Sequence, residues 1–138
     1  MSEPYKPSTL KHGEELCQEL ASNNSIDSVG ILDDEGNTIA SKGFNITPQE
    51  FKDIKYILIN DKPDYKLGTI TINNVTYNEL TKYSDGLYYA KAGETGCVIA
   101  KNIKSLIVAT LHCKHTSSLF DACEKIKSTS QFIKFDGY

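Results

Sequence analysis

The sequence predicts a single α+β domain in which a central antiparallel sheet carries the N- and C-terminal helices on one face and a short helix on the other. Three observations indicate this layered α/β fold. Apolar residues recur at helical spacing near both ends of the chain, turn residues separate short alternating segments over residues 68–112, and a capped helix interrupts the strands. A chain of 138 residues is long enough for one sizeable core and too short for two.

The N-terminal part is expected to form an arm and a helix that lead into a β-hairpin. Residues 1–9 include two prolines and are expected to be irregular, which leaves one domain over residues 10–138. Apolar residues at helical spacing predict a helix that begins at Leu10. Segments 28–32 and 37–41 are then predicted to be strands, because an acidic turn with a glycine separates them.

The start of the middle helix is the clearest local signal in the chain. Thr47 is a good N-cap residue, Pro48 fits the first helical position, and Glu50 stands where a capping box needs a carboxylate. Ile46 and Phe51 occupy the two positions of a hydrophobic staple. This pattern predicts a short amphipathic helix of about three turns.

The C-terminal half is predicted to contain about five strands and a last helix. The continuously apolar segment 106–111 is expected to be the central strand, covered on both faces. Ser118 and Asp121 have the spacing of a capping box at the start of the last helix. The buried stripe of that helix is expected to comprise Leu119, Ala122, Cys123, Ile126, Ser130 and Ile133.

The charge balance argues against several classes of function. The net charge is −3 and all fifteen basic residues other than histidine are lysines, so the chain lacks both the basic surface and the arginine forks expected of a nucleic-acid binder. No apolar run reaches the ~20 residues of a membrane-spanning helix, and no signal peptide is visible. We therefore expect a cytoplasmic protein with neither nucleic-acid nor integral membrane contact.

The sequence offers little that could support catalysis. Cys113, between His112 and His115, is the sole candidate nucleophile, but neighbours on a strand point to opposite faces. The four cysteines are expected to be free thiols, and no spacing matches a zinc site. The glycine-bearing loop at residues 91–96 leads into a strand and is expected to be a β-turn. We expect a non-enzymatic protein with no metal and no cofactor.

Five segments in the same order resemble the profilin family. The segments 29–41 and 44–50 resemble its first strands and capped helix, and 91–101, 106–110 and 124–126 resemble its later hairpin, strand and last helix. The likeness extends over residues 10–138. Within the family, the chain resembles divergent members such as the fourth, testis-type profilin or archaeal relatives. It implies the fold predicted above and an actin-monomer-binding protein, associated with the cytoskeleton, that regulates actin polymerisation.

The resemblance also implies which residues contact actin or an actin-like protein. The family's actin face is formed by middle strands, the end of the short helix and the start of the last helix. Carried over position by position, it implies contacts by Thr81, Lys82, Lys91, Lys101, Lys114, His115, Ser118, Asp121, Ala122 and Lys125. The lysines in this set suit an acidic partner, because charges at the rim of an interface raise the association rate.

The family's polyproline site is expected to be weak or lost. Profilins bind proline-rich peptides between aromatic residues of the terminal helices and a tryptophan, but this chain has no tryptophan at all. The residues left at matching places are Tyr5, Ile39, Phe132, Phe135 and Tyr138. Losing stacking faces and the indole N–H weakens recognition of a polyproline helix. Phosphoinositide binding is likewise expected to be weak, because lysines are spread over the chain and arginine is absent.

A second family shares the expected topology. Roadblock and longin-type domains also contain a helix, a hairpin with an acidic turn, a second helix and further strands, and they act as dimerising scaffolds for small GTPases or motor complexes. This alternative predicts a stable homodimer, whereas the profilin resemblance predicts a monomer that binds its partner one to one.

Overall fold

The computed structural model describes residues 6–22, 26–59, 66–113 and 115–135. Along the chain the elements are α1 (Lys6–Ala21), β1 (Ile26–Asp33), β2 (Thr38–Lys42), α2 (Pro48–Ile59), β3 (Lys66–Ile72), β4 (Val75–Ser84), β5 (Leu87–Ala92), β6 (Thr95–Lys101), β7 (Ser105–His112) and α3 (Thr116–Phe135). None of the helices in these ranges is long and apolar enough to cross a membrane.

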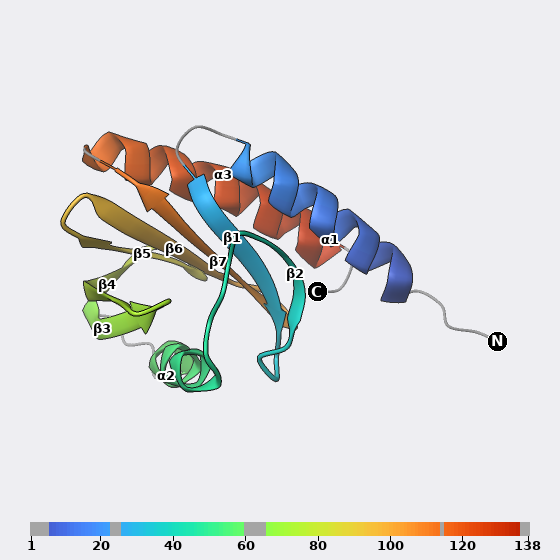
Figure 1. Ribbon diagram of the computed structural model, residues 1–138, viewed down its shortest axis with the longest axis horizontal. Coiled ribbons are helices and arrows are strands. Elements are labelled where there is room, and N and C mark those ends of the chain that lie inside the picture. Colours follow the sequence, from blue (N-terminus) through green and yellow to red (C-terminus); the bar gives the residue numbers. More distant parts are fainter. Residues whose placement is uncertain (1–5, 23–25, 60–65, 114, 136–138) are drawn as a thin grey trace.

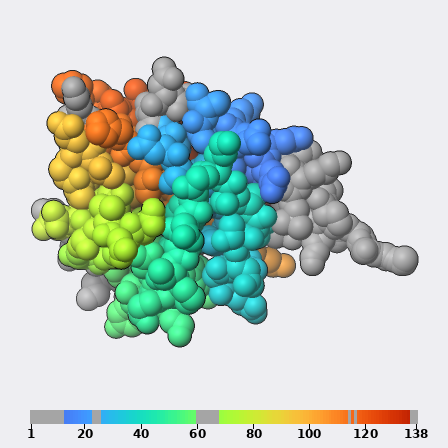
Figure 2. Space-filling model, viewed as in Figure 1, coloured from blue at the N-terminus to red at the C-terminus, as the bar shows by residue number. Residues whose placement is uncertain are grey.

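The strands form one antiparallel seven-stranded sheet in the order β2-β1-β7-β6-β5-β4-β3. The terminal helices α1 and α3 pack on one face and α2 packs on the other, as Figure 1 shows. In the space-filling view, α2 and the β3–β4 hairpin lie together below, opposite the terminal helices (Figure 2). The fold class predicted from the sequence is therefore confirmed.

Three local predictions differ from the structure. The first helix begins at Lys6, inside the segment expected to be an irregular arm, and Pro7 is tolerated there because the first turn of a helix does not need its N–H. The last helix begins at Thr116, so Ser118 lies within its first turn and is not an N-cap. The segment 106–111 lies in β7, which is buried on both faces, but β6 occupies the middle of the sheet.

Each face of the sheet has its own hydrophobic core. The core under α1 and α3 includes the predicted stripe of α3, of which Leu119 and Ile126 are fully buried. The core under α2 includes Phe51 and Ile54. Strand alternation divides the sheet between them: Val98 of β6 belongs to the α3 side, and Ile99 belongs to the α2 side.

The capping box predicted for α2 is present and extends beyond the helix. The Glu50 backbone N–H donates to the Thr47 hydroxyl (3.1 Å), and the Thr47 N–H donates to Glu50 Oε1 (3.1 Å). The same carboxylate accepts the backbone N–H groups of Asn73 (3.1 Å) and Asn74 (3.0 Å) in the β3–β4 turn. Both asparagines have positive φ, so Glu50 joins α2 to a tight left-handed turn.

A buried polar network joins the β6–β7 turn to α3. Asn102 Nδ2 donates to the Ser105 hydroxyl (3.0 Å), and the Ser130 hydroxyl donates to Asn102 Oδ1. The three residues are each less than 8% exposed. Because buried polar groups are costly unless they are paired, this network fixes the turn against the helix.

Candidate protein-binding face

Three aromatic side chains form a cluster where α3 lies against β4 and β5. The ring of Phe120 lies 5.6 Å from that of Tyr83 and 5.4 Å from that of Tyr89, and the two tyrosine rings are 6.3 Å apart. Phe120 is 36% exposed and the two tyrosines are half-buried. Two of the three contacts are edge-on, a favoured geometry for aromatic pairs, so the rings support one another at the surface.

Strand alternation and register bring these residues together. Tyr89 belongs to the α3 side of β5, because it pairs with Val98 of the core beneath α3. Irregular register between β4 and β5 places Thr81 directly opposite Tyr89. Lys91 follows on the same side of β5, two residues after Tyr89. We call Thr81, Tyr83, Tyr89, Lys91 and Phe120 the aromatic face.

A hydrogen bond from Tyr83 to α3 fixes one edge of the aromatic face. The Tyr83 hydroxyl donates to Glu124 Oε2 at 2.5 Å. This bond, with smaller contributions from burial and from the negative charge of Glu124, raises the pKa of Tyr83 to about 12. Glu124 lies one helical turn after Phe120, so both residues are on the side of α3 that is turned toward β4 and β5.

The predicted actin contacts on the strands are divided between the two faces of the sheet. Thr81 and Lys91 lie on the aromatic face, as described above. Lys82 is opposite Tyr88, which belongs to the core under α2, and its ammonium lies 3.6 Å from the carboxylate of Asp85. Lys101 lies on the α2 side as well, two residues after Ile99. Lys82 and Lys101 therefore lie on the opposite face of the sheet from Thr81 and Lys91.

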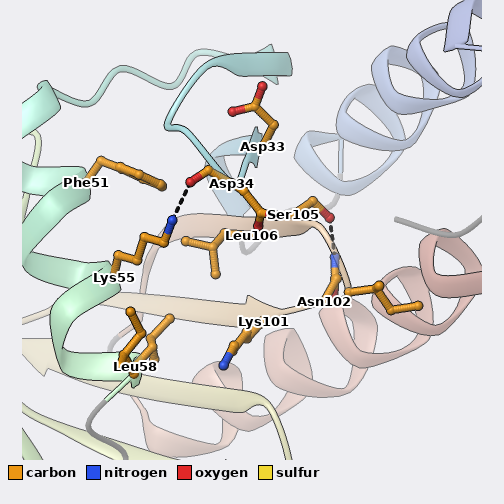
Figure 3. A pocket seen from close by; sticks show the side chains of 11 residues that line it. Asp33, Asp34, Phe51, Lys55, Leu58, Lys101, Asn102, Ser105 and Leu106 are labelled. Atoms are coloured by element: carbon orange, nitrogen blue, oxygen red, sulfur yellow. Dashed lines mark hydrogen bonds between the residues drawn. The ribbon is translucent and has the colours of Figure 1, made fainter.

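Lys101 lines a small pocket between α2, the β1–β2 turn and the β6–β7 turn, as Figure 3 shows. On the opposite wall Lys55 Nζ donates to the backbone carbonyl of Asp34 at 2.5 Å and lies over the ring of Phe51. The cavity measures about 70 Å³. Sites for cofactors and drug-sized ligands have roughly 300–1,000 Å³, so this pocket is too small for such a group.

The predicted contacts on α3 lie mostly on its other side. Intervals of seven residues, about two helical turns, separate Ser118 from Lys125 and Lys125 from Phe132, so all three share a side of the helix. Phe132 lines a groove against α1, so this side faces α1. Asp121 is exposed, and its charge helps to raise the pKa of Tyr83, so it lies near the aromatic face. Ala122 is buried in the core and cannot contact a partner.

Two further predicted contacts directly precede α3 in the sequence. His115 is exposed just before α3. Lys114 lies outside the described residues. Of the predicted actin contacts that lie within the described residues, Thr81 and Lys91 are the two that belong to the aromatic face.

The open groove between α1 and α3 contains one candidate for proline-rich recognition. Phe132 of α3 lines it together with Leu16 and the acidic residues Glu15 and Glu19 of α1. Phe135 is almost fully exposed but does not line the groove, and Ile39 packs against the core under α1. Tyr5 and Tyr138 lie outside the described residues.

The cysteines have the properties of core thiols. All four are free and buried. Burial raises the pKa of Cys17 and Cys123 to about 12, and burial also raises the pKa of Cys113. A thiol with a raised pKa is a poor nucleophile at neutral pH, so Cys113 is not an activated residue. No group of three metal-ligating side chains occurs within the described ranges.

Sequence reasoning missed Tyr83, Tyr89, Phe120 and Glu124 as neighbours in a candidate protein-binding face. A weak signal was present for Phe120, which directly follows the buried Leu119 and therefore lies at the border of the apolar stripe. The irregular register that sets Thr81 opposite Tyr89 leaves no recognisable pattern in the sequence.

Comparison with known proteins decides the family. The profilin family model matches residues 14–131, most of the chain. The chain belongs to the profilin family. This result favours the profilin resemblance over the roadblock and longin alternative. Among curated proteins, none matches this sequence.

Solved profilins share the fold of this profilin at low sequence identity. Schizosaccharomyces pombe profilin is 16% identical with a TM-score of 0.76, over 91% of this chain and 99% of that one. LokiProfilin1, crystallised with rabbit actin, is 14% identical with a TM-score of 0.62, over 94% and 99%. Mouse profilin IIa, in complex with a double repeat from the FH1 domain of mDia1, is 15% identical with a TM-score of 0.67, over 90% and 97%.

Proposed function

We propose that this profilin binds monomeric actin or an actin homologue one to one through the aromatic face, and thereby regulates actin polymerisation. The observation that carries the proposal is the cluster of Tyr83, Tyr89 and Phe120, which leaves aromatic surface accessible next to Thr81 and Lys91. Exposed aromatic clusters of this kind are characteristic of the centres of protein interfaces. Family membership and the complex of LokiProfilin1 with rabbit actin support actin as the partner.

Assembly of pyrene-labelled actin tests this function. We expect the purified protein to slow nucleation and filament growth when it is present at several-fold excess over actin from its own host, because a bound monomer is withdrawn from assembly. Unchanged kinetics at that excess would contradict the proposal. Light scattering on the protein alone should give a monomer, whereas a stable homodimer would favour the dimerising-scaffold alternative.

We also propose that proline-rich peptides bind weakly in the groove between α1 and α3. The groove offers the ring of Phe132, and the chain has no tryptophan to supply a second stacking face and an N–H donor. The loss of such contacts costs on the order of 2–4 kcal/mol, which lowers a micromolar affinity toward millimolar. Mouse profilin IIa shows that the fold can accommodate an FH1 repeat.

Titration of isotope-labelled protein with a decaproline peptide checks this expectation. Small shifts of residues around Phe132 that do not saturate below about 1 mM are expected, and Phe132→Ala should remove them. Lys91→Ala serves as the control, because Lys91 lies on the aromatic face and not in the groove. Saturable binding well below millimolar concentration would refute the weak-site proposal.

A further inference from the structure

We infer that the rings of Tyr83, Tyr89 and Phe120 supply most of the affinity for actin, and that Glu124 acts as a positioning residue that holds Tyr83 in place. The inference rests on the proposed function and specifies which chemistry the partner must offer. It adds to the expectation drawn from the sequence, in which lysines at the rim of the contact raise the rate of association with an acidic partner.

Two of the charged side chains near the aromatic face are engaged within the molecule, whereas Asp121, whose charge acts on Tyr83, is exposed. Lys82 lies 3.6 Å from Asp85, and the carboxylate of Glu124 accepts the Tyr83 hydroxyl. Lys101 and Lys125 belong to other surfaces, as shown above. Lys91 is thus the one lysine of the aromatic face as defined here, and a single exposed ion pair contributes only about 0–1 kcal/mol.

The rings are the stronger source of binding energy. Tryptophan, tyrosine and arginine dominate the energetic centres of interfaces, and this chain has neither tryptophan nor arginine. Phe120 contacts both tyrosine rings, and Tyr83 is further held by Glu124. Rings that are already held in place lose little conformational freedom on binding, so more of the gain from burying them is retained.

This arrangement defines the chemistry of the contact. The aromatic face fits an actin surface with apolar side chains at the centre of the contact and polar groups around them. Burial of apolar area depends little on ionic strength, whereas lysine–carboxylate attraction is screened by salt. An aromatic centre therefore predicts an affinity that changes little with salt.

Calorimetric titration of full-length variants with host actin tests the inference at two salt concentrations. We expect Phe120→Ala to weaken binding by roughly 10–100-fold, and Lys91→Ala to weaken it by no more than about fivefold. Phe135→Ala is the matched control, because Phe135 is an exposed phenylalanine at the far end of the same helix, and it should leave the affinity unchanged. Between about 50 and 200 mM salt, the wild-type affinity should change by less than about threefold.

Variants of the Tyr83–Glu124 bond separate positioning from simple loss of fold. Glu124→Ala should weaken binding, and Glu124→Gln, which can still accept the tyrosine hydroxyl, should restore much of the affinity. Circular dichroism and thermal unfolding verify that each variant is folded. Phe120→Leu, which keeps an apolar side chain but removes the ring, provides a second test if Phe120→Ala does not fold.

The outcomes distinguish this inference from the function on which it rests. Absence of binding by the wild-type protein would overturn both. Normal wild-type binding that Phe120→Ala leaves within twofold, or that Lys91→Ala and added salt abolish, would overturn the inference alone. An equal loss in Glu124→Gln and Glu124→Ala would refute the positioning role of Glu124.

Discussion

Replacement of Glu50 by glutamine is expected to lower the free energy of unfolding at neutral pH by about 2–4 kcal/mol. The carboxylate accepts backbone N–H groups from Thr47, Asn73 and Asn74, and the residue is 7% exposed. Glutamine has nearly the same shape, but it carries no charge and its amide nitrogen cannot accept a hydrogen bond. At least one of these part-buried N–H groups therefore loses its partner. Urea unfolding, with Glu35→Gln as an exposed control, measures the difference.

The same residue makes stability dependent on acid pH. Burial by itself would raise the pKa of Glu50, but the N–H donors of Asn74, Thr47 and Asn73 outweigh it and hold the pKa below its ordinary value of 4.5. The stabilisation is therefore present above pH 4.5 and is lost as the pH falls through the lower pKa of the folded state. The pKa of Asp33 is lowered as well, so its contribution has the same sign.

A comparison of pH profiles separates this effect from general acid unfolding. We expect the stability of the wild-type protein to fall more steeply below about pH 4.5 than that of Glu50→Gln, so that the two curves converge in acid. Parallel curves from pH 7 to pH 3 would show that Glu50 is not the group that titrates.

The second large effect is expected at Asn102, which lies between the β6–β7 turn and α3. Asn102→Leu should lower the free energy of unfolding by about 2–3 kcal/mol, because the Ser130 hydroxyl loses its acceptor and Ser105 loses a donor inside the protein. Asn102→Leu combined with Ser130→Ala should cost less than the sum of the two single changes, since residues in one hydrogen-bond network are not independent. Additive losses, measured by thermal and urea unfolding, would contradict the network.

Much of the fold could be predicted because it is determined by local signals. Hydrophobic spacing identified the buried side of α3, and the Thr47-to-Glu50 capping box marked the start of α2. Helix starts without such a signal were predicted less well. α1 begins before Leu10 because Pro7 is compatible with a first turn. At α3 the capping-box spacing of Ser118 and Asp121 was misleading, because the helix begins at Thr116.

The candidate site was harder to predict because it depends on contacts between distant elements. Residue positions carried over from the family assigned Lys91 and Lys101 to one actin contact, yet strand alternation sets them on opposite faces of the sheet. The hydrogen bond between Tyr83 and Glu124 spans 41 residues, and the contact of Glu50 with Asn74 spans 24. Neither has a local pattern, so only the three-dimensional structure shows them.

Hydrogen–deuterium exchange of this profilin with and without host actin tests the central claim most directly. The account predicts slower exchange in β4, β5 and the first turns of α3 when actin is bound, because contact removes solvent from the backbone of the aromatic face. It predicts no change in α2, which lies on the other side of the sheet, and no change in the β6–β7 turn, which lies outside the contact. Protection confined to α2, or to the groove between α1 and α3, would contradict the account.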